Sequence, residues 1–563
     1  MAPSATGTTT NGTTNGVANK SNGASQTAPQ PPITPKPQFL TTMNGAPVQF
    51  PAASQRIGAN LRATLLLQDI NLLEIIQHLT HERIPERLVH ARGTSAFGWF
   101  EVTDAIDDVT SAAFLNQVGK RTPLFVRFST VAGERGSAET VRDTRGFAFK
   151  MRTEEGILDW LFLSTPVFPI RDGAKFPSFT HATKRNPVSG LPDHTMFWDY
   201  FTNNQEAIHF LMFLFSDRAT PVSFQNADCF SINTYRFTKP DGTFKYVKIH
   251  VKTSQGVKNF TFPEAVKTAG EDPDYHTRSL HEDLEAGNQP AWDVYAQIID
   301  PEVAEHYQIN IFDATKTLPF EDFPLRKFGK IYLDKNVRDF FSESEQSAFS
   351  PTNIVPGWAL TPDPILQTRS LAYADTQRHR LGTNFIQFPI NKPESSFTPL
   401  NRDGNAAINN LDGYPNYYPS SFQSYIQAPQ YAQPDEELWN GTVVDFESTL
   451  DDKADFTQAT IFWEKTLAGE PGQQDNFVSN VAVHLASVTV ASVRQAVYDM
   501  FTKVNADLGM RIQKATEEEV AKKTAPKPPV KAMGAMNLGA KKAAFGKGHN
   551  AGIFAHKRQS AQA

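Results

Sequence analysis

The sequence predicts an α+β fold whose centre is a set of antiparallel strands, arranged as a barrel or a sandwich. Short runs of alternating hydrophobic and polar residues recur between about residues 97 and 335, as in 124–129 and 147–152. A Pro240-Asp241-Gly242 turn signal precedes a third such run, 244–253. Helical spacing of hydrophobic residues is instead found mainly near the two ends of the chain, so strands and helices are largely segregated.

Length and composition indicate a large globular protein. The chain has 563 residues, of which 40% are hydrophobic, and it contains 42 Phe against 14 Tyr and 7 Trp, which predicts a Phe-rich core. The net charge of −6 is too small to suggest a nucleic-acid partner or binding to an anionic membrane. Composition thus excludes wholesale disorder.

Cysteine usage and the chain ends bear on the compartment. A single cysteine, Cys229, excludes an intramolecular disulfide and a thiolate metal cluster. No run approaches the roughly 18 apolar residues needed to span a bilayer, and the N-terminus has neither a secretory nor a mitochondrial leader pattern. The final residues 560–563 differ from the usual peroxisomal ending. We therefore expect an intracellular protein, cytoplasmic or peroxisomal, without a membrane partner.

The N-terminal part divides into two segments. Residues 1–55 are rich in Thr, Asn, Gly, Ala, Ser and Pro and predict a disordered arm. Residues 56–96 form the next segment, in which hydrophobic residues at helical spacing, from about 60 onwards, predict a helix that ends near Pro85. Within the strand-rich region 97–335, one insertion, Asp193 to Asp217, is apolar at helical spacing and begins with a capping aspartate.

The C-terminal part divides into three segments. Residues 336–440 are rich in Pro, Asn and Ser with isolated helices, and predict a segment that wraps around other parts of the molecule. Residues 441–515 predict a small helical domain and residues 516–563 a basic disordered tail. The helices expected in that domain are Thr457–Leu467, Gln474–Ala486 and Ser492–Leu508.

One helix in the wrapping segment carries a distinctive face. Asp363 can cap a helix that ends at Gly382. At about 100° per residue, Arg369, Tyr373 and Arg380 fall at roughly 0°, 40° and 20° on it. Two nearby cations favour a phenolate, which is a hard anionic ligand suited to ferric iron. Spacing alone favours the alternative, in which this face pairs with acidic residues elsewhere.

Two further clusters could contribute chemistry. The first is Arg83 to His90, followed by Ala91-Arg92-Gly93; a lone histidine is most often structural. The second is the strand 125–129, in which Arg127 and Ser129 share a face. There a guanidinium could hold an anionic group while the hydroxyl orients an imidazole. The sequence contains neither a phosphate-binding loop nor a zinc-type spacing of Cys and His.

Four segments in this order resemble the haem catalases. They are RIPERLVHARG, VRFSTVAGERGSAETVRDTRGFAFK, STPVFPIRDGAKFPSF and RSLAYADTQRHRLG, and the similarity extends from about residue 60 to about residue 500. The resemblance implies an antiparallel eight-stranded β-barrel with an N-terminal arm, a wrapping segment and a C-terminal helical domain. It also implies a homotetramer whose N-terminal arms thread through neighbouring wrapping segments, and an enzyme that uses hydrogen peroxide.

The resemblance also implies a site and a cofactor, b-type haem with ferric iron. Tyr373 matches the haem-iron ligand, Arg369 the arginine beside it, and Phe176 the ring stacked on the haem. His90 matches the distal acid–base residue and Ser129 its hydroxyl partner. The remaining matches are Arg87, Arg127 and Arg380 for the propionates, Val89 before the distal histidine, and Asp143 in the access channel.

The departures from the family pattern concern both sides of the haem. Leu163 and Ser164 stand where the family has two asparagines, the first of which points into the distal pocket. Loss of that amide predicts weaker peroxide dismutation and a relative gain for the oxidation of organic substrates. Further departures are Ala374 for a proline, Gln377 for a histidine and Asn233 for a histidine.

The sequence leaves the binding of NADPH open. Several residues match the nucleotide site found in many catalases: His209, Phe213, Ser216, Arg218 and Lys252. Leu318 and Phe320, however, replace a tryptophan and a histidine of that site.

The sequence is compatible with two enzymatic functions. One is an intracellular catalase-type enzyme; another is a catalase-like enzyme of fungal secondary metabolism that oxidises or cyclises an organic substrate, as in chanoclavine formation during ergot alkaloid synthesis. Leu163 favours the enzyme that acts on an organic substrate. The pairing of His90 with Ser129 counts against a purely structural haem protein, and the unaltered Val89 counts against a lyase acting on fatty hydroperoxides.

Overall fold

The computed structural model describes residues 39–50, 52–58, 63–422, 425, 426, 428, 442–447 and 452–524. The chain forms two compact units, Met1–Ile84 and Pro85–Ala563. The disorder expected for the first 38 residues and for residues 525–563 lies outside the described residues. Among the described residues, no helix is both long and apolar enough to cross a membrane.

The N-terminal unit contains a short hairpin and one helix. Strands β1 (Arg56–Ile57) and β2 (Thr64–Leu65) pair antiparallel, and α1 spans Ile70–Leu79. The expected helix from about 60 to Pro85 is therefore too long. Helix α1 begins after Asp69, because Oδ1 of Asp69 accepts a hydrogen bond from the backbone NH of Leu72 at 3.1 Å.

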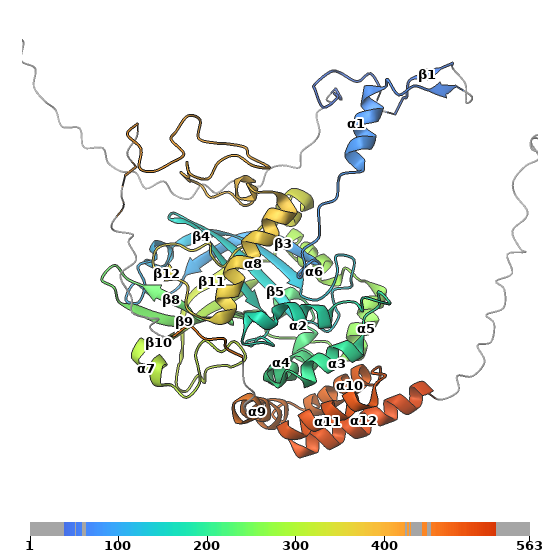
Figure 1. The fold of residues 1–563 in the computed structure, drawn as a ribbon, viewed down its shortest axis with the longest axis vertical. Coiled ribbons are helices and arrows are strands. Elements are labelled where there is room, and N and C mark those ends of the chain that lie inside the picture. The colour runs from blue at the N-terminus through green and yellow to red at the C-terminus, as the bar shows by residue number, and fades with distance from the viewer. Residues whose placement is uncertain are drawn as a thin grey trace, which may run out of the picture. The chain divides into compact units, whose positions relative to one another are not determined.

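The larger unit is built on a closed eight-stranded antiparallel barrel, as expected (Figure 1). Strand β10 pairs with both β11 and β9, which closes the sheet in the order β10-β11-β3-β4-β5-β6-β7-β9. The bounds are β3 Gly93–Val102, β4 Arg121–Thr130, β5 Arg145–Thr153, β6 Gly156–Leu163, β7 Cys229–Phe230, β9 Phe244–Thr253, β10 Ala291–Ile299 and β11 Leu325–Asn336. Strands β8 (Tyr235–Thr238) and β12 (Trp358–Ala359) extend the sheet beside β9.

The barrel core is filled by aromatic rings, which accounts for much of the Phe content. Phe100, Phe128, Phe147 and Phe149 are fully buried, together with Trp160. The rings of Phe128 and Phe147, on adjacent strands, meet edge to face with centroids 5.0 Å apart. Close packing of this kind fixes the barrel wall, and with it the strand ends that carry the site.

The helices outside the C-terminal region are more numerous than the sequence predicts. The insertion from Asp193 to Asp217 contains α3 (His194–Thr202) and α4 (Ile208–Phe215), and Asp193 caps α3 as expected. Four helices were not predicted: α2 Phe176–Thr183, α5 Phe262–Glu271, α6 Tyr275–Glu285 and α7 Pro301–His306. They are short and bury few apolar residues, so their hydrophobic period is faint.

Helix α8 (Pro364–Leu381) confirms the predicted helix of the wrapping segment. The carboxylate of Asp363 accepts hydrogen bonds from the backbone NH groups of Ile365 and Leu366, at 2.9 and 3.1 Å. The helix ends at Gly382, whose φ of +102° favours glycine.

The C-terminal region contains α9 (Asp452–Ile461), a π-helical turn (Phe462–Leu467), α10 (Gln473–Leu485), α11 (Ala491–Val504) and α12 (Ala506–Thr524). The expected helix Ser492–Leu508 is wrong as a single element, because the backbone of Asn505 is extended and divides it. The side chain of Asn505 starts α12 by accepting a hydrogen bond from Asp507 NH at 2.9 Å. Since α12 reaches Thr524, the disordered tail expected from 516 begins too early.

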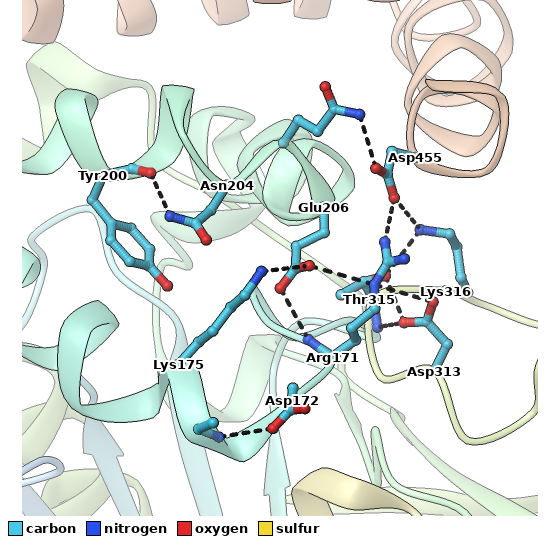
Figure 2. Close-up of polar contacts among 12 residues, drawn as sticks. Arg171, Asp172, Lys175, Tyr200, Asn204, Glu206, Asp313, Thr315, Lys316 and Asp455 are labelled. Carbon is cyan, nitrogen blue, oxygen red and sulfur yellow. Dashed lines mark hydrogen bonds and ion pairs between the residues drawn. The ribbon is translucent and has the colours of Figure 1, made fainter. Parts of the chain in front are cut away.

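A network of buried charges connects α9 with the segment that follows β6 (Figure 2). Arg171 forms ion pairs with Glu206, Asp313 and Asp455, and the side chain of Asp455 is completely buried. Lys316 also approaches Asp455, with Nζ 3.7 Å from Oδ1. These ion pairs connect α9 to Arg171, in the segment after β6, and to Lys316.

Candidate functional site

The backbone of His90 is held in a left-handed conformation, with φ +63°. Such a conformation costs about 1–3 kcal/mol for a residue other than glycine. The backbone NH of His90 donates to the carbonyl oxygen of Val131 at 3.0 Å. The Arg127 guanidinium donates to the carbonyl oxygens of His90 and Ala91, at 2.7 and 3.2 Å. Arg127 therefore fixes the backbone that presents the imidazole.

The imidazole of His90 packs against two adjacent strands. Its Nδ1 lies 2.8 Å from Oγ of Ser129 on β4, within hydrogen-bonding distance. Ser129 pairs in register with Gly146 on β5. A Cβ atom at position 146 would lie 2.5 Å from Nδ1 of His90, so the ring needs a glycine there.

The surroundings keep His90 neutral. Burial lowers its pKa from 6.5 to about 3, and the charges of Arg127, Arg369 and Arg87 act in the same direction. With Nδ1 facing Ser129, Nε2 is the nitrogen available to a molecule in the cavity. The residue can therefore accept a proton at ordinary pH.

Leu163 contributes an apolar side chain to the same cavity. It pairs in register with Gly146 at the end of β6. The next residue, Ser164, uses its Oγ to accept a hydrogen bond from the backbone NH of Arg145 at 2.8 Å. Of the two departures at this point, Leu163 thus determines the polarity of the cavity wall.

Helix α8 brings Arg369 and Tyr373 together, as its sequence pattern predicts. Nη2 of Arg369 lies 3.4 Å from the Tyr373 hydroxyl and donates to the carbonyl oxygen of Leu161 at 2.8 Å. Burial acts to lower the pKa of Arg369, but the nearby phenols of Tyr373 and Tyr235 outweigh it, so the pKa is raised. Arg369 therefore remains charged beside the phenol.

A short chain of hydrogen bonds orients Arg369 from behind. Its Nη1 donates to Oδ1 of Asn233, and Nδ2 of Asn233 donates to the Asp363 carboxylate at 2.8 Å. Asp363 is also the residue that caps α8. The start of the helix and the position of Arg369 are thus set by one buried carboxylate.

Buried arginines gather where α8 meets the segment 344–347. Arg87 donates to the carbonyl oxygens of Ser344, Glu345 and Ser347 at 2.9–3.1 Å, and Arg380 donates to the last two. Burial, then repulsion between neighbouring arginines, lowers the pKa of Arg87, whereas the Glu345 carboxylate acts to raise it. One carboxylate therefore faces an excess of guanidinium groups, which favours a negatively charged ligand.

These residues line a cavity of about 420 Å³, a size typical of sites for organic cofactors. Arg87, Val89, Arg127, Ser129, Phe176 and Asp143 all line it, together with His90, Leu163, Arg369 and Tyr373. Arg380 lies behind the lining, on the same carbonyl oxygens as Arg87. The described residues contain no cluster of three or more His, Cys, Asp or Glu suited to a metal ion.

The cavity fits a haem. Its largely apolar wall suits a porphyrin, the unneutralised arginines suit the two propionates, and the phenol of Tyr373 could supply an oxygen ligand for iron. Nε of Arg127 is buried without a hydrogen-bond partner among the described residues, which leaves a donor for an anionic group.

The structure also identifies participants that the sequence analysis missed. Gly146, Glu345 and His484 belong to or border the cavity but lie far apart in the chain. No local pattern marks them, although Gly146 lies inside a segment that carries the resemblance.

The residues matched to a nucleotide site lie elsewhere. His209 and Phe213 pack against Phe462, with ring centroids 6.3 and 4.6 Å apart, respectively. Nζ of Lys252 lies 5.2 Å from the ring centroid of Phe320. Apolar rings of this chain thus contact three of the matched positions.

Known proteins share this fold and much of this sequence. The family model described as Catalase matches residues 41–424, and one described as Catalase-related immune-responsive matches residues 449–516. Catalase A of Botryotinia fuckeliana is 75% identical over 452 residues, which cover 80% of this chain and 94% of that protein. Catalase of Schizosaccharomyces pombe is 47% identical over 494 residues, covering 87% and 95%, respectively. The crystal structure of a fungal catalase matches with a TM-score of 0.83 at 44% identity, covering 85% of this chain and 97% of that one.

The barrel, its cavity and these similarities define a haem-dependent oxidoreductase of the kind that uses peroxide. The chain belongs to the catalase family. Members of this family bind haem, act on hydrogen peroxide and are typically tetrameric.

Proposed function

We propose that this chain is a haem catalase that consumes hydrogen peroxide, with dismutation weakened by Leu163. The observation that carries the proposal is the single cavity that contains a neutral imidazole, His90, and a phenol, Tyr373, held beside a charged guanidinium. The first group suits proton transfer and the second suits ligation of ferric iron.

The residues of the cavity divide into those that bind haem and those that move protons. Tyr373 would ligate the iron, with the charged Arg369 beside its hydroxyl. Arg87, Arg127 and Arg380 bind the propionates, and Val89 and Phe176 contact the porphyrin. Haem, when bound, supplies the redox-active iron at which peroxide reacts.

His90 transfers the proton. Its Nε2 accepts a proton from a peroxide oxygen and returns it to the oxygen that departs as water, while Nδ1 stays hydrogen-bonded to Ser129. General acid–base catalysis of this kind contributes about 10²–10⁴ in rate. His90 does not need to lose a proton before it accepts one from peroxide, because burial keeps the imidazole neutral.

Leu163 sets the balance between dismutation and other reactions. A leucine cannot donate a hydrogen bond to peroxide, and a positioned polar donor commonly contributes about 10²–10³ in rate. We expect Leu163→Asn to raise oxygen release from hydrogen peroxide by about tenfold or more. Leu163→Met keeps the wall apolar and is expected to leave the rate nearly unchanged.

The test is oxygen release by the haem-loaded protein, normalised to haem content. Equal rates in wild type, Leu163→Asn and Leu163→Met would show that the residue does not limit dismutation. Such a result would reject the weakening proposed here.

A second candidate function is the peroxide-dependent oxidation or cyclisation of an organic substrate, which the apolar wall at Leu163 favours. If this activity is physiological, Leu163→Asn should lower oxidation of a small phenol while oxygen release rises. Parallel changes in both activities would instead support the first function alone.

The assembly we propose is the homotetramer typical of the family. Helix α1 has no buried residue within this chain, and Ile70, Ile75, Ile76 and Leu79 are each at least half exposed. An apolar helix of this kind suits burial against another copy. Nucleotide binding is not part of the proposal, since Phe320 and Phe462 contact the matched positions.

A further inference from the structure

The cavity that contains His90 also reaches α10, in the C-terminal helical region. Its lining there includes Phe197, Phe201, Phe210 and Leu214, and one residue of α10, His484. The C-terminal helices therefore form part of the wall of the site.

The hydrogen bonds of His484 determine where its proton lies. Nε1 of Trp198 donates to Nδ1 of His484 at 2.9 Å. An indole NH can only donate, so Nδ1 is an acceptor and carries no proton. Burial lowers the pKa of His484 well below 6.5, with the His194 and Arg142 charges acting in the same direction, so the ring is neutral. The proton of the neutral ring is therefore on Nε2.

The ring of His484 is also held in place. Nδ1 of His194 donates to the backbone carbonyl oxygen of His484 at 2.9 Å, and the two imidazole centroids are 4.0 Å apart. The rings of Phe197 and Phe215 meet it edge to face, at 4.9 and 5.3 Å. In the described part of the chain, no acceptor forms a hydrogen bond with Nε2. A fixed NH group is thus available to the cavity among apolar rings.

We propose that His484 is a substrate-binding residue whose Nε2–H anchors an acceptor oxygen of an organic molecule, with the apolar body of that molecule on Phe197, Phe201, Phe210 and Leu214. The class of ligand is a small, neutral, mainly apolar compound with a carbonyl or ether oxygen. Apolar pockets generally fix a ligand's orientation through a few polar groups of this kind. The inference deepens the second candidate function, on which its biological meaning rests.

A matched pair of probes tests this anchor. Acetophenone and α-methylstyrene have nearly the same shape, but only acetophenone has an acceptor oxygen. Their dissociation constants are measured by calorimetry on the haem-loaded full chain, without peroxide. We expect the preference for acetophenone over α-methylstyrene to be about fivefold to tenfold greater in wild type than in a variant without the donor, because a net hydrogen bond contributes at most about 1.5 kcal/mol.

Two substitutions separate the hydrogen bond from packing. His484→Phe keeps a flat ring but removes the donor, and is expected to shift the ratio of the two dissociation constants by about fivefold to tenfold towards α-methylstyrene. His484→Gln can accept from Trp198 and still donate, and is expected to retain part of the preference. Binding of α-methylstyrene should change little in either variant, because it forms no hydrogen bond.

A spectroscopic measurement covers the case in which His484→Phe does not fold. The carbonyl stretch of ¹³C-labelled acetophenone bound to wild type should lie below its value in hexane, as hydrogen bonding requires. An unshifted band, no binding at millimolar concentration, or an unchanged preference in His484→Phe would each overturn the proposal. Because these measurements use no peroxide, a failure of organic oxidation would count against the second function and not against this site.

Discussion

His90 combines a strained backbone with a neutral side chain. The carbonyl bonds from Arg127 stabilise its left-handed backbone, and burial keeps its pKa at about 3. Both features suit the proton-transfer role proposed for His90, since an imidazole that accepts a proton must be correctly placed and unprotonated.

The pKa of His90 predicts the acid limb of the activity. The group is active when neutral, and its pKa lies below the ordinary 6.5, so kcat/KM for peroxide should be nearly flat from about pH 8 to pH 5. Protonation should reduce it only as the pH approaches about 3, with the fold monitored in parallel by circular dichroism. A decline with a midpoint near 6.5 would show that His90 is not held neutral.

Gly146 offers a test of the placement of His90. In Gly146→Ala the new Cβ would meet the imidazole at 2.5 Å, so the ring must shift. We expect about a 100-fold loss of kcat for peroxide with haem content retained, in line with the loss of a positioned acid–base group. Gly136→Ala is the matched control, because a Cβ there has no neighbour within 4 Å. Equal activity of the two variants would contradict the proposed role of His90.

Residue-level patterns predict contacts along one element better than contacts between elements. The shared face of Arg369 and Tyr373 follows from helical geometry and is confirmed. The alternative that this face pairs with acids is wrong for Arg369, whose partners are Asn233 and a backbone carbonyl. Asn233 lies between β7 and β8, and the carbonyl belongs to Leu161 on β6, so both are far from α8 in the sequence and no local spacing indicates them.

At the scale of elements, capping residues were the most reliable signals. Asp193, Asp363 and Gly382 set helix ends where the sequence predicts them. The division at Asn505 was missed because the hydrophobic period continues across it, from α11 into α12. The helix α9 depends on tertiary contacts instead, through the charges around Asp455 (Figure 2).

The charge network predicts how firmly α9 is attached. Asp455→Asn leaves Arg171 and Lys316 with one fewer buried carboxylate, and removing a buried partner costs about 3–5 kcal/mol. We expect faster amide hydrogen exchange in α9 and a lower unfolding temperature. Asp475→Asn breaks the exposed pair with Arg511, which should contribute less than about 1 kcal/mol. If both variants behave alike, the network does not anchor the helix.

At the scale of the whole molecule, the sequence predicts strands but not the closure of the barrel. Alternation indicated antiparallel strands and left a barrel and a sandwich equally open; the resemblance to catalases indicated eight strands. Closure depends on the pairing of β10 with β9 as well as β11, a long-range contact that no local pattern encodes.

The barrel, α8 and the segment 344–347 meet at the cavity and surround it with more cationic than anionic groups. Haem is therefore the group that we propose completes this site, with Tyr373 as its iron ligand. The most direct test is resonance Raman spectroscopy of the ferric, haem-loaded protein. We predict phenolate bands in wild type and in Tyr414→Phe, which alters an exposed tyrosine, and their loss in Tyr373→Phe. Phenolate bands that persist in Tyr373→Phe would contradict ligation of the haem iron by Tyr373.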